Sequence, residues 1–112
     1  MPFRPTRIVI HPDVDATYRE LERQADAKRQ PAVAIWKGFQ TALKRIKRDG
    51  QWGEAIPRIP KTFRSRYGVM NLYCVDLASF HRCFYTIRCR EVIFLDLVDH
   101  AEYDRLFGRK KR

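Results

Sequence analysis

The sequence predicts an α+β fold in which a small, antiparallel-rich sheet packs on an N-terminal helical hairpin. Two amphipathic segments follow one another in the first half of the chain, and three runs rich in β-branched and aromatic residues follow in the second half. The links between these three runs are short, as in antiparallel hairpins. With 112 residues, 45% hydrophobic and 32% charged, the chain has the length and composition of one folded domain, residues 1–112.

The first strand and the first helix are predicted at the start of the chain. Residues 7–10, Arg-Ile-Val-Ile, form a short apolar run that ends at His11-Pro12. Proline suits the first position of a helix, so the helix is expected to begin there and to continue to about Lys28. Its apolar positions, spaced by four, three and four residues, are Val14, Tyr18, Leu21 and Ala25.

A second amphipathic helix follows the break at Gln30-Pro31 and is expected to stop at Asp49-Gly50. Its apolar stripe consists of Ile35, Phe39, Ala42, Leu43 and Ile46. The two helices therefore form a hairpin. The next segment, residues 51–67, is rich in glycine, proline and charge, which predicts mostly loop with a helical turn near residues 61–66.

Three strands, a short helix and a basic end are predicted for the rest of the chain. The strands span residues 69–77, 80–89 and 92–98, the helix spans 101–107, and the basic end spans 108–112. On the last strand, alternation places Leu95 and Leu97 on one face and Phe94 and Asp96 on the other. The complete order is strand, helix, helix, strand, strand, strand, short helix.

The helical hairpin is expected to cover one face of this sheet and to leave the other face open. Alternation places Cys74, Asp76 and Arg82 on the open face, with Phe84 beside them. Polar groups are therefore expected to line the uncovered side. That open face is where the sequence predicts a functional site.

The charge of the chain points to a polyanionic partner. Basic residues number 23 and acidic residues 13, which gives a net charge of +10 and a pI near 10.0. Nucleic acid is the first candidate for such an excess. Between residues 28 and 75 there are eleven basic and two acidic residues, so nearly all of the excess lies there.

The sequence gives no sign of export, a membrane segment or a metal site. The apolar runs fall short of the roughly 18 residues that a membrane helix needs, and the start of the chain lacks a signal peptide, so we expect a cytoplasmic protein. Cys74, Cys83 and Cys89 form no C-x-x-C motif and are expected to be reduced thiols packed in strands. No metal and no organic cofactor is expected.

Two further features of the second helix region have alternative interpretations. The pairs Lys44-Arg45 and Lys47-Arg48 lack acidic neighbours to compensate them. They are either the solvated face of the helix or a surface that contacts phosphates. Trp52, which follows the helix, is expected to pack in the loop rather than to act as a stacking platform.

Three pieces of the second half together carry a family resemblance. Residues 73–77 form a strand that is followed by the strand 82–87, which contains the pattern R-x-x-Y at Arg82. An apolar last strand comes next, and residues 99–103, Asp-His-Ala-Glu-Tyr, lead to Leu-Phe-Gly at 106–108. In these pieces the chain resembles the C-terminal half of the RelE/ParE superfamily of bacterial and archaeal toxins, and the order of elements agrees along the whole chain.

The resemblance implies a small, metal-independent endoribonuclease. Toxins of the ribonuclease branch cleave messenger RNA, often on the ribosome, and a cognate antitoxin protein neutralises them. His100 matches a histidine that some members carry a few residues before a phenylalanine, and it is expected to exchange a proton near neutral pH. Arg82 matches the central-strand arginine and is expected to grip the scissile phosphate.

One departure from the family pattern concerns positive charge. The RelE branch places lysines at the positions that are Cys74 and Asp76 here. We expect cations from the preceding loop to supply the missing positive charge, and an aromatic residue after the histidine to stack a base, since aromatic faces accept any nucleobase. The expected substrate-binding residues are Lys61, Arg64, Arg66 and Tyr103.

Each of these residues also has a purely structural interpretation. His100 can cap the last helix, Arg82 can form an ion pair with Asp76, and Tyr103 can be a hydrophobic anchor. Two other functions fit the same sequence. One is a ParE-like toxin that binds and inhibits a target such as DNA gyrase without catalysis, and the other is an inactive RNA-binding relative.

Overall fold

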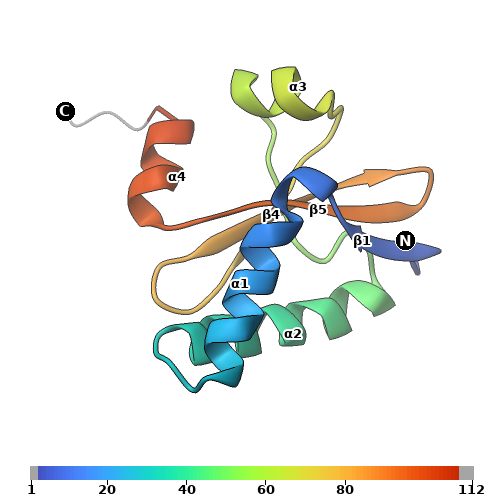
Figure 1. Ribbon diagram of the computed structural model, residues 1–112. Coiled ribbons are helices and arrows are strands. Elements are labelled where there is room, and N and C mark those ends of the chain that lie inside the picture. Colours follow the sequence, from blue (N-terminus) through green and yellow to red (C-terminus); the bar gives the residue numbers. More distant parts are fainter. Residues whose placement is uncertain (1–2, 109–112) are drawn as a thin grey trace.

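The computed structural model describes residues 3–108, and these residues form four α-helices and one five-stranded mixed sheet (Figure 1). The strands are β1 (Arg7–Ile10), β2 (Glu54–Ala55), β3 (Tyr73–Asp76), β4 (Arg82–Arg88) and β5 (Glu91–Val98). The helices are α1 (Asp15–Asp26), α2 (Ala32–Arg48), α3 (Lys61–Tyr67) and α4 (His100–Leu106), and a 3₁₀ turn at Pro12–Val14 precedes α1. The α+β class is confirmed.

The sheet has the strand order β1-β5-β4-β3-β2. β2, β3, β4 and β5 pair antiparallel in succession, whereas β1 pairs parallel with β5. Two elements of this arrangement lie in the segment predicted as mostly loop. The two-residue strand β2 was not predicted, and the expected helical turn near residues 61–66 is the helix α3.

The predicted helical hairpin is confirmed and covers one face of the sheet. The apolar stripes of α1 and α2 meet the inward side chains of the strands in a first core. Its buried members are Val14, Tyr18, Phe39, Ala42, Ile46, Val75, Cys83, Tyr85, Val92 and Phe94. The Tyr18 hydroxyl, buried in this core, donates a hydrogen bond to the Leu95 carbonyl at 2.8 Å, and burial raises the pKa of Tyr18. This bond ties α1 directly to β5.

The prediction that the second face of the sheet is open is wrong. The short helices α3 and α4 lie on the opposite side of the sheet from α2 and close this face (Figure 1). Phe84 is completely buried there, with its ring centroid 5.0 Å from that of Phe63 and 5.7 Å from that of Phe107. Each short helix brings its own apolar side chains, so the face predicted to be polar is a second core.

A register shift near the end of β5 explains a further difference. Cys83 pairs with Leu97, whereas Tyr85 pairs with Phe94, so β5 has one more residue than β4 in this stretch. Such a bulge reverses the alternation of side chains beyond it. As a result Leu97 joins the first core with Phe94, and Asp96 turns to the face that α3 covers.

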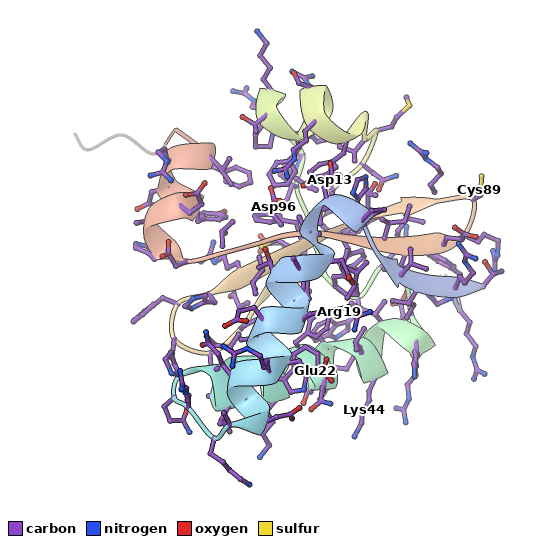
Figure 2. All side chains as sticks on the ribbon, viewed as in Figure 1. Asp13, Arg19, Glu22, Lys44, Cys89 and Asp96 are labelled. Carbon is purple, nitrogen blue, oxygen red and sulfur yellow. The ribbon has the colours of Figure 1, made fainter. Side chains whose placement is uncertain are left out.

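Two of the three cysteines lie in strands, as the sequence predicts. Cys74 and Cys83 are buried in strands, but Cys89 is exposed in the turn between β4 and β5 (Figure 2). The basic end at residues 109–112 lies outside the described residues. Within residues 3–108, none of the helices has the length and apolar character needed to cross a membrane.

Candidate functional site

Arg82, the first residue of β4, is held by two neighbours. It lies opposite Asp76 in the ladder, and its Nε is 2.9 Å from the Asp76 Oδ1. Its guanidinium carbon lies 4.1 Å from the ring centroid of Tyr103, within the range of a cation–π contact. The predicted ion pair with Asp76 is therefore present. The Arg82 side chain is 34% exposed, so an anion can still reach it from solvent.

Tyr103 supports Arg82 from α4. Its ring also stacks against Phe107, at 4.5 Å between centroids, and against Phe84 at 6.2 Å. The anchor interpretation of Tyr103 describes these contacts. Because Arg82 and Phe107 already pack on the Tyr103 ring, a base could stack there only by taking the place of Arg82.

His100 is the first residue of α4, and its side chain is 60% exposed. The expectation that it caps the helix is wrong, because Asp99 is the N-cap and its carboxylate accepts a hydrogen bond from the Glu102 amide at 2.9 Å. The His100 Nε2 lies 3.4 Å from the Asp104 carboxylate. A histidine in this position can exchange protons with any substrate that lies along the start of α4.

Arg82 and His100 lie at the same end of the sheet. Arg82 pairs across the ladder with Val98, and His100 follows Val98 by two residues. His100 and Tyr103 are three positions apart on α4 and therefore share a side of the helix. The Arg82 guanidinium packs on that same Tyr103 ring. We refer to Arg82, His100, Tyr103 and their acidic partners Asp76 and Asp104 as the edge site.

The positions at which the RelE branch has lysines carry no positive charge here. Burial raises the pKa of the Cys74 thiol to about 12, so this group is neutral at physiological pH. The other position is an acidic residue, Asp76, whose side chain is 79% exposed. The edge site therefore holds one permanent cation, Arg82, beside two acidic residues, Asp76 and Asp104.

The three basic residues of α3 do not join the edge site. The Arg66 Nη1 lies 3.5 Å from the Asp96 Oδ1, and the Tyr67 hydroxyl donates to the same carboxylate at 2.7 Å. Burial and this bond raise the pKa of Tyr67. Lys61 and Arg64 are exposed on α3, and within residues 3–108 neither makes an ion pair. Their expected role toward RNA remains a prediction.

Arg66 and Asp96 line a hollow of about 330 Å³ beside the start of α4. Its other lining residues are Val14, Thr17, Leu97, Val98, Asp99 and Glu102. Three carboxylates and one guanidinium make this hollow acidic, which is unfavourable for phosphate. Across the described part of the chain, no group of three or more His, Cys, Asp or Glu side chains could hold a metal ion.

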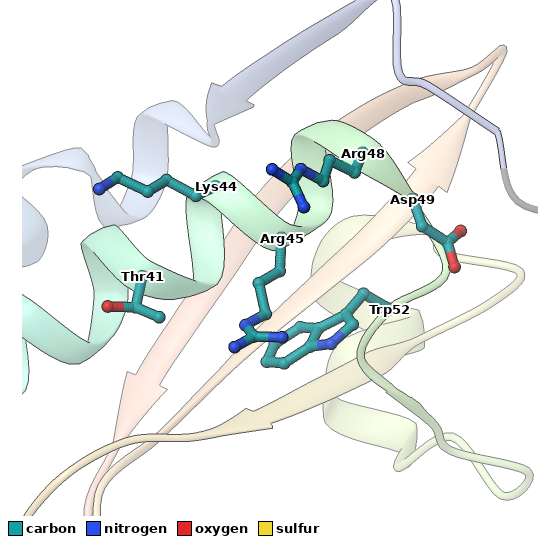
Figure 3. Close-up of a pocket in the computed structure, with 6 residues that line it drawn as sticks. All are labelled: Thr41, Lys44, Arg45, Arg48, Asp49 and Trp52. Atoms are coloured by element: carbon teal, nitrogen blue, oxygen red, sulfur yellow. The ribbon is translucent and has the colours of Figure 1, made fainter.

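A basic pocket at the end of α2 was not among the predicted site residues. It has a volume of about 370 Å³ and is lined by Thr41, Lys44, Arg45, Arg48, Asp49 and Trp52 (Figure 3). The Arg45 guanidinium carbon lies 5.8 Å from the centroid of the Trp52 ring. The signal for this site was present in the sequence as basic pairs without acids followed by a tryptophan. We call it the Arg45–Trp52 pocket.

The turn that carries Trp52 is fixed from the first core. The Tyr85 hydroxyl donates to the Gly50 carbonyl and accepts from the Gly53 amide, both at 2.8 Å. Burial raises the pKa of Tyr85, so the hydroxyl keeps its proton and both bonds. A Cβ on Gly53 would come within 2.9 Å of the Tyr85 ring. Glycine is therefore required for this close approach, and Trp52 is held in one place.

A second hollow leads from this pocket toward the edge site. It has a volume of about 240 Å³ and is lined by Trp52, Gly53, Glu54, Cys74, Val75 and Asp76. Trp52 therefore belongs to both hollows, and Asp76 at the far end is the ion-pair partner of Arg82. Because β2 pairs only with Tyr73 and Cys74, the outer edge of β3 beyond Cys74 is unpaired. The two sites are connected along this edge.

No family model matches the chain, and no curated protein or solved structure is significantly similar to it.

Proposed function

We propose that the protein is a metal-independent endoribonuclease of the RelE/ParE toxin type, which cleaves messenger RNA in the cytoplasm. The observation that carries the proposal is the common position of Arg82 and His100 at one end of the sheet. Apart from β2 and α3, which lie between the second helix and β3, the chain has a strand, two helices, three antiparallel strands and a final helix, in the order that this type of toxin implies. The net charge of +10 favours RNA as the substrate.

The proposed reaction is an attack of a ribose 2′-oxygen on the adjacent phosphorus. The O2′–P bond forms and the P–O5′ bond breaks, which leaves a cyclic phosphate on one fragment and a 5′-hydroxyl on the other. The proton of the 2′-hydroxyl must be removed and one must be given to the leaving O5′. His100 carries out one of these two transfers, because a neutral imidazole accepts and an imidazolium donates near pH 7, and solvent water accepts or supplies the other proton.

Arg82 stabilises the negative charge that develops on the phosphate during this reaction. Negative charge on the phosphate oxygens increases as the phosphorus becomes crowded, and a guanidinium can donate two parallel hydrogen bonds to them. In the free protein the Asp76 carboxylate forms an ion pair with the Nε of Arg82. Because this ion pair is exposed, it contributes only about 0.2–1 kcal/mol, and a bidentate phosphate can replace Asp76.

The proposed partners are RNA, on the ribosome or free, and a cognate antitoxin. An antitoxin segment with acidic side chains would complement the basic α2 surface and would compete with RNA for it.

The test is a comparison of histidine variants. His100→Ala is expected to slow cleavage of a target transcript about 10²–10⁴-fold, the usual contribution of an acid or base. Primer extension on transcripts from cells that express each protein measures the cleavage, and growth measures the toxicity. His81→Ala is the matched control, because the His81 ring bonds to the Ser79 carbonyl in the hairpin before β4 and has no proposed role. Cleavage by His100→Ala at the parent rate would contradict the assignment.

A ParE-like inhibitor is the second candidate, and one observation favours it. Both proposed catalytic side chains already have carboxylate partners, Asp76 and Asp104, as in a surface without catalysis. The same experiment separates the candidates. Growth arrest by the parent protein without any cleaved transcript, and equal arrest by His100→Ala, would identify a binding toxin.

A further inference from the structure

Positive charge in the Arg45–Trp52 pocket is uncompensated. Within residues 3–108, no carboxylate lies within ion-pair distance of Lys44, Arg45 or Arg48. The acidic residue in the lining, Asp49, accepts a hydrogen bond from the Gln51 amide at 3.0 Å and is thereby held in the turn. Three cations that repel one another in a small volume favour an anionic ligand.

Trp52 adds a flat apolar surface to this charge. The residue is 42% exposed, which is unusual for so large an apolar group. The contact with Arg45, at 5.8 Å, is close to the outer limit of about 6 Å for a cation–π interaction. An incoming ring can therefore pack against the indole by displacing this weak contact with Arg45. Figure 3 shows Arg45 and Trp52 side by side below α2, with Lys44 and Arg48 along the helix above them.

A nucleobase with its flanking phosphates combines the two properties that the pocket requires. The base is a flat ring that can stack on Trp52, and the phosphates supply charge for the cations. A volume of about 370 Å³ is at the lower end of the range for small-ligand pockets. An acidic peptide would satisfy the cations but would leave the indole without a stacking partner.

We propose that the Arg45–Trp52 pocket binds one unpaired base of single-stranded RNA, stacked on Trp52, with the flanking phosphates at Lys44, Arg45 and Arg48. The inference rests on the proposed function for the identity of the ligand. The hollow beside β3 then gives the RNA strand a route from Trp52 to Asp76 and Arg82. Because the charged residues that line it, Glu54 and Asp76, are acidic, the strand would follow this route with its phosphates turned toward solvent. From Cys74 to Asp76 this route covers about 7 Å of strand. The pocket captures the RNA, and the edge site is where the RNA is cleaved.

The test measures binding with two probes that carry the same phosphate charge. One is a short 2′-O-methyl oligouridine, which cannot undergo attack by the 2′-oxygen, and the other is a ribose-phosphate chain of the same length without bases. Fluorescence anisotropy of the labelled probes gives both affinities. Trp52→Ala is expected to weaken binding of the oligouridine about 5- to 150-fold, the contribution of one stacked base. Its affinity for the chain without bases should equal that of the parent.

Two further variants control for folding and for loss of any exposed apolar group. Trp52→Phe keeps an aromatic face and should retain most of the affinity for oligouridine. Met70→Ala removes an exposed apolar side chain outside the pocket and should bind like the parent. The inference is overturned if Trp52→Ala binds oligouridine as tightly as the parent, or if the parent binds both probes equally.

The outcomes for this inference and for the proposed function are separable. A parent protein that shows Trp52-dependent binding but never cleaves RNA would contradict the nuclease and support the pocket. A parent protein that cleaves RNA through His100 but binds oligouridine independently of Trp52 would support the nuclease and overturn the pocket.

Discussion

The two candidate sites differ in how their cations are compensated. At the edge site Arg82 has Asp76 at 2.9 Å and His100 has Asp104 at 3.4 Å. In the Arg45–Trp52 pocket the basic groups have no carboxylate partner among residues 3–108. Uncompensated charge attracts an anion over a distance, whereas paired charge acts only after the partner is displaced. The difference suggests that one site captures RNA and the other transforms it.

The two hairpin helices show the same contrast on a larger scale. On α1 the arginines pair within the helix, Arg19 with Asp15 at 2.8 Å and Arg23 with Glu20 at 2.6 Å. The bond from Arg23 lowers the pKa of Glu20 to about 2. On α2 the basic residues of the last turn make no ion pair within residues 3–108, although Asp49 follows them, and Lys44 projects outward from the helix (Figure 2). The hairpin therefore has one helix whose arginines are already paired and one whose basic residues are available to a polyanion.

The largest expected effect concerns the support of the edge site. Phe84→Ala is expected to lower the free energy of unfolding by about 3–5 kcal/mol, because it leaves a cavity under Phe63, Tyr103 and Phe107. Chemical denaturation of the full chain measures this loss. Met70→Ala, at an exposed position, should change the same quantity by about 0.5 kcal/mol or less. A similarly small loss for Phe84→Ala would contradict a closed second face.

A smaller effect is expected from the acid that compensates Arg82. Asp76→Asn removes one negative charge and leaves Arg82 free for a phosphate. Since an exposed ion pair contributes about 0.2–1 kcal/mol, RNA affinity should rise about 1.5- to 5-fold in an anisotropy titration. Glu91→Gln is the control. It makes the same charge change at the end of the sheet that lies opposite Asp76 and Arg82. Weaker binding by Asp76→Asn would mean that Asp76 contributes to the RNA site rather than opposing it.

The sequence predicted those parts of the fold that depend on long or regular patterns. The stripes of α1 and α2 extend over three turns or more, and alternation on β3 and β4 correctly placed Cys74 and Phe84 on the same face of the sheet. The sequence placed a helical turn and a helix near α3 and α4 but did not show that they cover the second face. With seven residues each, these helices are too short for a helical period to reveal an apolar side. A bulge in β5 depends on how two strands pair, and alternation within one strand does not reveal it.

The two sites differ in the same way. His100, Arg82 and Tyr103 came from a local motif, and the fold brings them to one end of the sheet. The Arg45–Trp52 pocket depends on a turn fixed by Tyr85, which is 32 residues away from Gly53 in the chain. A contact over that distance cannot be inferred from the local sequence, which shows the basic pairs and the tryptophan but not the turn that places them in one pocket.

Single-turnover cleavage of a labelled RNA, measured over a range of protein concentrations, tests the separation of the two sites most directly. The account predicts that Trp52→Ala raises the half-saturating concentration about 5- to 150-fold and leaves the maximal rate unchanged. It predicts that His100→Ala lowers the maximal rate about 10²–10⁴-fold at an unchanged half-saturating concentration. A fall in the maximal rate of Trp52→Ala as large as that of His100→Ala would contradict the separation of capture from cleavage.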